Sequence, residues 1–228
     1  MGILTPQDLT YQVDSQTVRG YLAIPERGEG PGVIVLHAWW GLTPFFTRLC
    51  DRLATAGFVA FAPDLNRGKT AGTIEEAQQI MAERDFGLTK AVATNALEQL
   101  RANPRVQGSK IGVVGFSMGA SWGLLLSTYA PEEIAAVVLF YGTEGVDFAA
   151  TRAAFLGHYA EQDEWEPLEG VQQMEADMRA AGRDVRLFVY PEASHWFFEE
   201  DRHNAYNHPA AQLAWERTVT FLDDHLRQ

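Results

Sequence analysis

The stretch KIGVVGFSMGASWG, Lys110–Gly123, joins an apolar run typical of a strand to a run typical of a helix, with a serine at the junction. Its centre, Gly115–Gly119, has the pattern G-x-S-x-G. A serine at so sharp a strand-to-helix turn requires small residues two positions away, because larger side chains would collide with the strand or the helix. The stretch therefore predicts a turn that exposes the hydroxyl of Ser117. The alternative is a glycine-rich turn in which Ser117 only caps the helix.

Short apolar strands and amphipathic helices alternate on both sides of this stretch. We expect strands at residues 17–24, 33–37, 58–62, 111–115, 135–141, 154–158 and 185–190. We expect helices from Pro44 to Gly57, from Thr73 to about Ala102 with Gly87 as a potential break, and at residues 117–129, 168–181 and 210–226. This alternation predicts the α/β class, with a mostly parallel central sheet covered by helices on both faces. The length of 228 residues fits one domain, residues 1–228, although two domains also fit.

The charge of the chain bears on its partners. Asp and Glu number 30 against 18 Lys and Arg, so the formal net charge is −12. Such a chain repels phosphates, and we expect neither a nucleic-acid partner nor binding to an anionic membrane surface. The single cysteine, Cys50, excludes an internal disulfide and any zinc site built from cysteines. Its apolar helical surroundings favour a buried structural role.

The N-terminal segment MGILTPQDLT, residues 1–10, has no basic region and no long apolar run, so we expect no signal peptide. The chain also has no apolar run of transmembrane length. These features predict a cytoplasmic protein. The sequence does not indicate an oligomeric state.

A serine hydroxyl is a poor nucleophile unless a base removes its proton, and in a parallel α/β sheet that base should follow a later strand. Of six histidines, His195 alone lies in a loop directly after a strongly predicted strand, and we expect it to be the base. The acid that orients it should lie in the preceding loop, GHYAEQDEWEP. Asp163 is central there and is our choice. The carboxylates that stay open on spacing alone are Glu161, Glu164 and Asp147.

Stabilising the negative oxygen of a tetrahedral intermediate takes two backbone N–H groups. One should belong to Met118, directly after the serine. The other should come from the segment HAWWG after the strand at residues 33–37, where Trp39 is favoured by position.

Six segments together resemble the dienelactone hydrolase family of α/β-hydrolases: VIVLHAWWGL, GFVAFAPDL, KIGVVGFSMGA, GHYAEQDEWEP, VYPEASHWFF and the helix after the first. The resemblance spans most of the chain. It implies an α/β-hydrolase fold, with Ser117 as nucleophile, Asp163 as acid, His195 as base, and the amides of Trp39 and Met118 as the oxyanion hole.

Three positions differ from the best-known members of that family. Ser117 stands where they carry cysteine, as in a serine esterase-like branch. Ala38 replaces a glutamate that activates the cysteine, and Glu199 replaces an arginine that holds a substrate carboxylate. An anion at Glu199 would oppose a carboxylate-bearing substrate. The resemblance therefore implies ester hydrolysis without implying dienelactone as the substrate.

Aromatic residues are concentrated in the loops that we expect at the carboxyl ends of the strands. We assign Trp40, Phe45, Trp165 and Trp196 to a substrate pocket suited to an apolar acyl or aromatic group, although each ring could instead pack its loop against the core. We expect no cofactor and no metal, because the spacing of His195, Glu199 and His203 has no further ligand pattern around it.

Two functions fit these features. The first is a serine hydrolase that cleaves small or medium apolar carboxylic esters or lactones through an acyl-enzyme, with a small-molecule ester or lactone as its partner. The second is a non-catalytic α/β-hydrolase-like module that binds a small molecule or a protein. Three candidate residues in the order Ser, acid, His favour the first, because a binding module does not need them.

Overall fold

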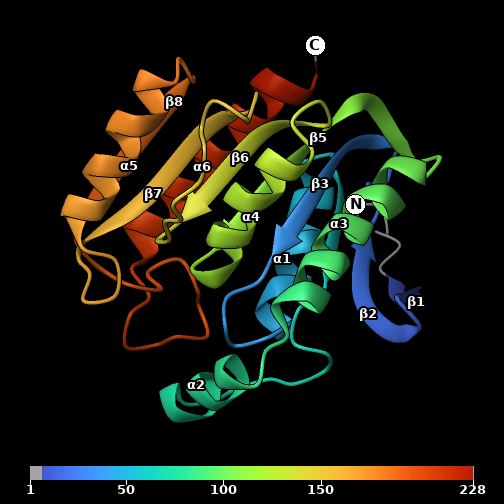
Figure 1. The fold of residues 1–228 in the computed structure, drawn as a ribbon, viewed down its shortest axis with the longest axis horizontal. Helices are drawn as coiled ribbons and strands as arrows, with labels where there is room; N and C mark the ends of the chain where they lie inside the picture. The colour runs from blue at the N-terminus through green and yellow to red at the C-terminus, as the bar shows by residue number, and fades with distance from the viewer. Residues whose placement is uncertain (1–6, 228) are drawn as a thin grey trace. The chain divides into compact units, whose positions relative to one another are not determined.

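The computed structural model, drawn in Figure 1, describes residues 7–227. These residues form two compact units, one ending at Ile111 and the other beginning at Gly112. The strand β5 (Val106–Phe116) carries the chain from the first unit into the second. The interpretation of residues 1–228 as one domain stays a prediction.

The strands of the first unit lie in the order β1-β2-β4-β3. Their bounds are β1 (Gln7–Val13), β2 (Gln16–Ala23), β3 (Gly30–Leu36) and β4 (Val59–Pro63). β3 and β4 pair in parallel, whereas β2 pairs antiparallel with both β1 and β4. Every residue of β3 and of β4 is buried, as expected for strands covered on both faces.

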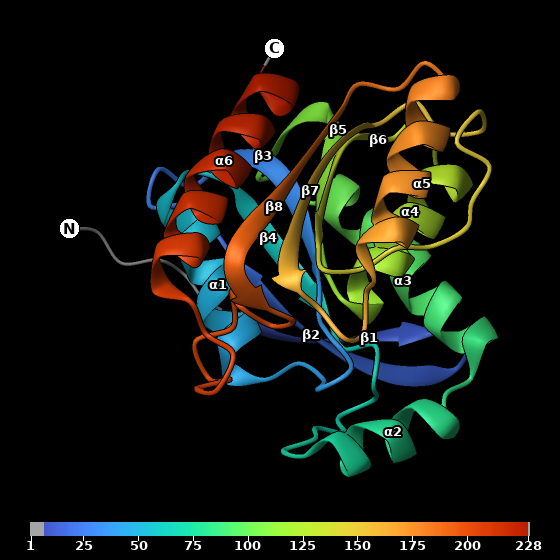
Figure 2. The same cartoon turned by 90° about the vertical axis from the view of Figure 1, so that its left-hand side faces the viewer.

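Three helices accompany these strands: α1 (Pro44–Thr55), α2 (Ile74–Ala82) and α3 (Phe86–Ala102). Within the first unit, α1 covers one face of the sheet and α3 the other (Figure 2). A capping box begins α2: the Thr73 side chain accepts from the Glu76 backbone, and the Glu76 side chain accepts from the Thr73 backbone. The suggested break at Gly87 is wrong. The helices separate at residues 83–85, because the Asp85 side chain caps α3 by accepting from the N–H of Leu88.

The second unit contains three parallel strands in the order β6-β7-β8 and three helices. The strands are β6 (Ile134–Phe140), β7 (Ala154–Gln162) and β8 (Val185–Ser194). The helices are α4 (Met118–Tyr129), α5 (Leu168–Ala180) and α6 (His208–Leu226). Within this unit, α6 lies on one face of the sheet and α4 and α5 on the other (Figure 2). Parallel strands covered by helices on both faces confirm the predicted α/β class.

Among residues 7–227, no helix combines the length with the apolar composition that a bilayer span requires. The cytoplasmic location stays a prediction. The expectation that residues 1–10 hold no signal peptide concerns a segment of which residues 1–6 lie outside the described range.

A buried polar network joins α6 to β7 and β8 in the second unit. Nδ1 of His158 lies 2.9 Å from the hydroxyl of Tyr190, and Nε2 lies 3.1 Å from Oγ1 of Thr218. Arg217 donates to the same Tyr190 hydroxyl at 3.1 Å. His158 is fully buried, and this burial, together with the nearby guanidinium of Arg217, lowers the pKa of His158 to about 3.

The low pKa of His158 predicts a pH-dependent contribution to stability. An unfolded chain protonates this imidazole near its ordinary pKa of about 6.5, whereas the folded chain does not, so stability from His158 is lost as pH falls below 6.5. We therefore expect the destabilisation caused by His158→Asn to be smaller at pH 5 than at pH 7 by about 2 kcal/mol. Urea unfolding of both chains at the two pH values measures this difference. An equal penalty at both values would mean that His158 is protonated in the folded chain.

Candidate active site

Ser117 occupies the turn between β5 and α4 with φ 50° and ψ −115°, a left-handed backbone conformation that residues with a side chain rarely adopt. Its N–H donates to the carbonyl of Phe140 at 2.9 Å, which ties the turn to the end of β6. A Cβ on Gly115 would lie 2.3 Å from the carbonyl oxygen of Gly119, so the steric reason for the first glycine of the motif is confirmed. Gly142 is likewise required, because a Cβ there would lie 2.5 Å from the carbonyl oxygen of Ser117.

The register of β7 against β8 places Asp163 beside His195. Gln162 pairs with Ser194 after an irregularity between Ala160 and Gln162, and each strand ends at that pair. Asp163 is the first residue after β7, and His195 is the first residue after β8. A bulge of this kind redirects the side chains that follow it, which explains why two residues 32 positions apart meet at one edge.

Three side chains of the second unit form one hydrogen-bonded series. Nδ1 of His195 lies 2.8 Å from Oδ2 and 2.9 Å from Oδ1 of Asp163, and Nε2 lies 3.1 Å from Oγ of Ser117. A carboxylate only accepts, so Nδ1 donates to Asp163, and Nε2 of the neutral ring is left to accept from the Ser117 hydroxyl. This is the arrangement in which an imidazole can take a proton from a serine.

Asp163 is held by the backbone as well as by His195. Its side chain is 1 % exposed, and Oδ1 accepts from the backbone N–H groups of Trp165 and Glu166 at 2.9 Å each. The other carboxylates that the spacing left open have different surroundings. Glu161 accepts from the N–H of Glu192, Asp147 accepts from the N–H of Ala149, and Glu164 is exposed. Of the four, the structure brings Asp163 to His195.

The two residues expected to supply the oxyanion hole belong to different units. Met118 is the first residue of α4, where backbone N–H groups have no acceptor within the helix. Trp39 follows β3 in the first unit. The pairing of their two amides stays a prediction.

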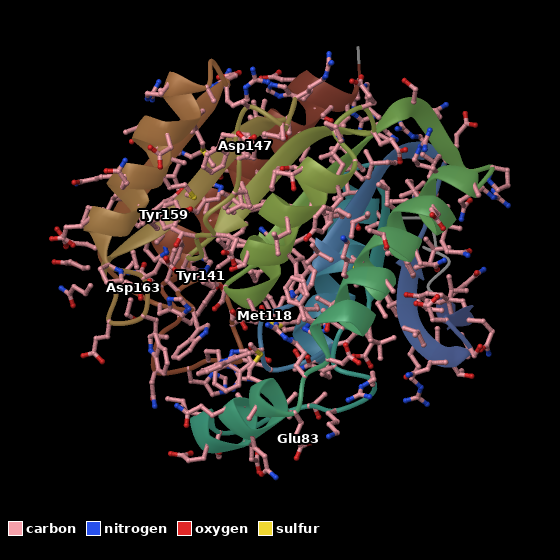
Figure 3. All side chains as sticks on the ribbon, in the orientation of Figure 1. Glu83, Met118, Tyr141, Asp147, Tyr159 and Asp163 are labelled. Carbon is pink, nitrogen blue, oxygen red and sulfur yellow. The ribbon has the colours of Figure 1, made fainter. Side chains whose placement is uncertain are left out.

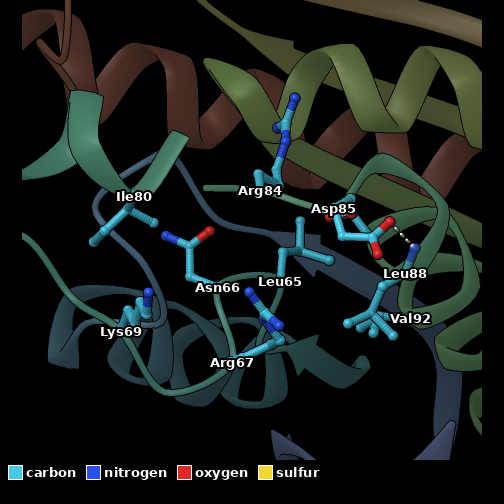
Figure 4. Close-up of a pocket in the computed structure, with 10 residues that line it drawn as sticks. Leu65, Asn66, Arg67, Lys69, Ile80, Arg84, Asp85, Leu88 and Val92 are labelled. Atoms are coloured by element: carbon cyan, nitrogen blue, oxygen red, sulfur yellow. Dashed lines mark hydrogen bonds between the residues drawn. The ribbon is translucent and has the colours of Figure 1, made fainter. Parts of the chain in front are cut away.

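The loop that contains Trp39 is fastened to residues 64–68 in a way that the sequence did not indicate. The Asn66 side chain donates to the carbonyl of Trp39 at 2.9 Å (Figure 4 shows Asn66). His37 is fully buried, its Nδ1 lies 2.7 Å from the carbonyl of Ala38, and its Nε2 accepts from the N–H of Leu65 at 2.9 Å. Burial lowers the pKa of His37, so the ring is neutral and serves to join the two loops.

The four aromatic residues assigned to a substrate pocket divide between the units. Trp40 and Phe45, in the first unit, are 2 % and 6 % exposed. Trp165 and Trp196, in the second, have ring centroids 5.8 Å apart, and Trp165 is 44 % exposed. The Trp165 centroid is 6.5 Å from that of His195, so these two rings form an aromatic surface beside the imidazole.

Two further carboxyl groups of the second unit, those of Glu166 and Glu199, form hydrogen bonds that the sequence did not indicate. Glu166 is half-buried and accepts from the Thr143 hydroxyl, and burial raises its pKa. Glu199 is 1 % exposed and accepts from the Tyr141 hydroxyl at 2.8 Å. Burial raises the pKa of Glu199 to about 8, so its carboxyl is mostly neutral at pH 7. Glu199 therefore does not provide the anion expected from its sequence position.

Metal ligation has no evident place in the described part of the chain. No group of three or more His, Cys, Asp or Glu side chains within residues 7–227 is arranged to hold a metal ion. His195 instead has both ring nitrogens within hydrogen-bonding distance of Asp163 and Ser117.

Two of the solved structures that resemble this fold illustrate the similarity. One is a dienelactone hydrolase-like promiscuous phosphotriesterase from metagenomic libraries, with a TM-score of 0.89, 22 % identity, and coverage of 98 % of this chain and 99 % of that one. The other is a dienelactone hydrolase from Anabaena variabilis, with a TM-score of 0.74, 22 % identity, and coverage of 98 % and 99 %. At identities this low, structural similarity establishes only the fold. The two TM-scores confirm the predicted α/β-hydrolase fold.

Sequence comparison adds the family. The chain is 34 % identical over 229 residues to protein usf of Aquifex pyrophilus, an alignment that covers 96 % of this chain and 99 % of the relative. The model of the dienelactone hydrolase family matches residues 18–226. A match over nearly the whole chain confirms the resemblance drawn from the motifs: this protein belongs to the dienelactone hydrolase family.

Proposed function

We propose that this hydrolase cleaves small or medium apolar carboxylic esters or lactones through an acyl-enzyme formed on Ser117. The observation that supports this most strongly is the series from Ser117 to His195 to Asp163, with separations of 3.1 Å and 2.8 Å. A module that only binds a ligand has no need of a neutral imidazole aligned between a serine and a buried carboxylate.

In the first half of the reaction, Oγ of Ser117 attacks the carbonyl carbon of the ester while Nε2 of His195 takes the hydroxyl proton. The carbonyl electron pair moves to oxygen, and the backbone N–H of Met118, at the start of α4, stabilises that negative charge. The tetrahedral intermediate collapses, the bond to the leaving oxygen breaks, and His195 returns its proton to that oxygen. Throughout, Asp163 stabilises the imidazolium and keeps its orientation.

In the second half, His195 removes a proton from water, whose oxygen attacks the acyl carbon. The bond from that carbon to Oγ of Ser117 breaks, and the proton on His195 passes to Oγ. A carboxylic acid leaves and the enzyme returns to its starting state. For a lactone the leaving oxygen stays attached to the acyl group, so the product is one hydroxy acid.

Charge in the second unit favours uncharged substrates. The loops after β6, β7 and β8, at residues 141–153, 163–167 and 195–207, contain seven carboxyl side chains besides the mostly neutral Glu199, against two arginines. Arg152 pairs with Glu132, and Arg202 lies 3.8 Å from Asp201, so both cations have acidic neighbours. The resulting negative potential should repel substrates that carry a carboxylate.

A substrate panel tests this proposal. It comprises p-nitrophenyl acetate, butyrate and octanoate, a simple lactone, a thioester, and dienelactone as the free carboxylate and as its methyl ester. We expect turnover of the uncharged esters and lactone, with kcat/KM for the methyl ester above that for the carboxylate by about tenfold or more. A preference for the carboxylate would contradict the proposed substrate class. Absence of any turnover would favour the binding module.

A further inference from the structure

Tyr141 packs against the imidazole of His195. It is the residue after β6, is fully buried, and has φ 38°, a left-handed conformation that a tyrosine adopts only where its surroundings enforce it. Its ring centroid lies 4.9 Å from that of His195, with the planes inclined at 55°. Its backbone N–H donates to the carbonyl of His158 at 2.8 Å, which anchors it to β7. Tyr141 and Asp163, both labelled in Figure 3, thus contact the same imidazole from the ends of β6 and β7.

The far end of the Tyr141 side chain is held by Glu199. The hydroxyl donates to Oε1 of Glu199 at 2.8 Å, and Glu199 lies four residues after His195 in the same loop. Its backbone is fixed in turn, because its N–H donates to the carbonyl of Trp196 and its carbonyl accepts from the N–H of Arg202, both at 2.9 Å. One hydrogen bond therefore connects the loop that contains His195 to the ring that packs on His195.

This bond supplies a constraint that Asp163 does not. The contact at Nδ1 fixes the direction of one ring nitrogen but permits the imidazole to tilt about that contact, which would move Nε2 away from Ser117. A ring packed against the imidazole opposes the tilt only if it is itself immobile. Tyr141 meets that condition through its backbone at one end and Glu199 at the other.

We propose that Tyr141 and Glu199 act as positioning residues that hold the imidazole of His195 in line with Ser117, an inference that rests on the hydrolase function proposed above. Both residues are buried and neither belongs to the series from Ser117 to Asp163, so the proposed role is exerted through His195. The carboxyl of Glu199 is needed as a hydrogen-bond acceptor rather than as a charge. The other ionisable groups that influence it, Asp201 and Arg202, act in opposite directions on its pKa.

The proposal predicts different outcomes for two substitutions of Glu199 at pH 7. Glu199→Gln keeps an acceptor oxygen at the same position, so kcat on p-nitrophenyl acetate should stay within about threefold of wild type. Glu199→Leu removes the acceptor and Tyr141→Phe removes the donor, and each should lower kcat by about tenfold or more, with KM changed less than about twofold. Glu199→Leu and Tyr141→Phe break the same hydrogen bond. The double variant that combines them should therefore have a kcat no lower than that of the slower single variant.

Tyr190→Phe is the matched control, because it also removes a tyrosine hydroxyl bonded inside the second unit, to His158 and Arg217. Urea unfolding confirms that each variant is folded at the assay temperature. If Glu199→Leu does not fold, the kcat values of Tyr141→Phe and Glu199→Gln still test the positioning role. Wild-type kcat in Tyr141→Phe, or additive losses in the double variant, would overturn the positioning role. Failure of wild type itself to hydrolyse esters would instead contradict the proposed function.

Discussion

Replacing Ser117 by alanine is expected to lower kcat on p-nitrophenyl acetate by at least about 10⁴-fold, because no other group can accept the acyl chain at that position. The change removes only Oγ. Alanine carries the same Cβ as serine, so the backbone at φ 50° is no more strained, and the N–H of residue 117 can still donate to Phe140. Loss of activity would therefore report on chemistry rather than on folding.

Ser121→Ala is the matched control for this experiment. Ser121 lies one turn further along α4, and its hydroxyl donates to the carbonyl of Thr143 at 2.9 Å. We expect it to retain kcat within a fewfold of wild type under the same conditions. Substantial hydrolysis by Ser117→Ala, beyond the rate of the uncatalysed reaction in buffer, would exclude Ser117 as the nucleophile.

Asp163→Asn is expected to lower kcat by about 10⁴-fold while leaving the fold intact. The asparagine oxygen can still accept from the N–H groups of Trp165 and Glu166, so the turn after β7 survives. Its amide nitrogen, however, presents hydrogens to Nδ1 of His195. The neutral ring must then carry its proton on Nε2, where it can no longer accept from Ser117.

Steady-state kinetics of Asp163→Asn beside Glu161→Gln and Glu164→Gln measure this effect. The two glutamine variants remove a charge from the same segment without touching His195, and each should stay within about threefold of wild type. Near-normal turnover by Asp163→Asn would assign the acid role to another carboxylate. A comparable loss in all three variants would mean that the charge of the loop matters more than its hydrogen bond.

Most of the fold could be predicted because the strands are continuous apolar runs and the helices have clear caps. The exceptions have local physical causes. β1 was missed because its sequence QDLTYQV is largely polar and mostly exposed. β8 was expected to end at Tyr190 but continues to Ser194, because Glu192 adopts φ 58° and its N–H finds an acceptor in Glu161. Propensity alone does not indicate such an extension across Pro191.

For the candidate site, the serine and the histidine were the easiest residues to choose. Ser117 lies in a motif whose glycines have a steric purpose, and His195 alone follows a strongly predicted strand directly. Asp163 could not be separated from its neighbours by spacing, since only the pairing of Gln162 with Ser194 decides which carboxyl reaches the imidazole. The bond between Tyr141 and Glu199 spans 58 residues and leaves no trace in any local pattern.

Intact-mass analysis and peptide mapping after reaction with a fluorophosphonate test the central claim most directly, because the reagent bonds only to a serine oxygen that a neighbouring base activates. Wild type should gain one phosphonyl group on the peptide that contains Ser117. Ser117→Ala should gain none, and His195→Ala should react at least about 100-fold more slowly. A wild-type chain that stays unmodified, or that carries the adduct on another residue, would contradict this account.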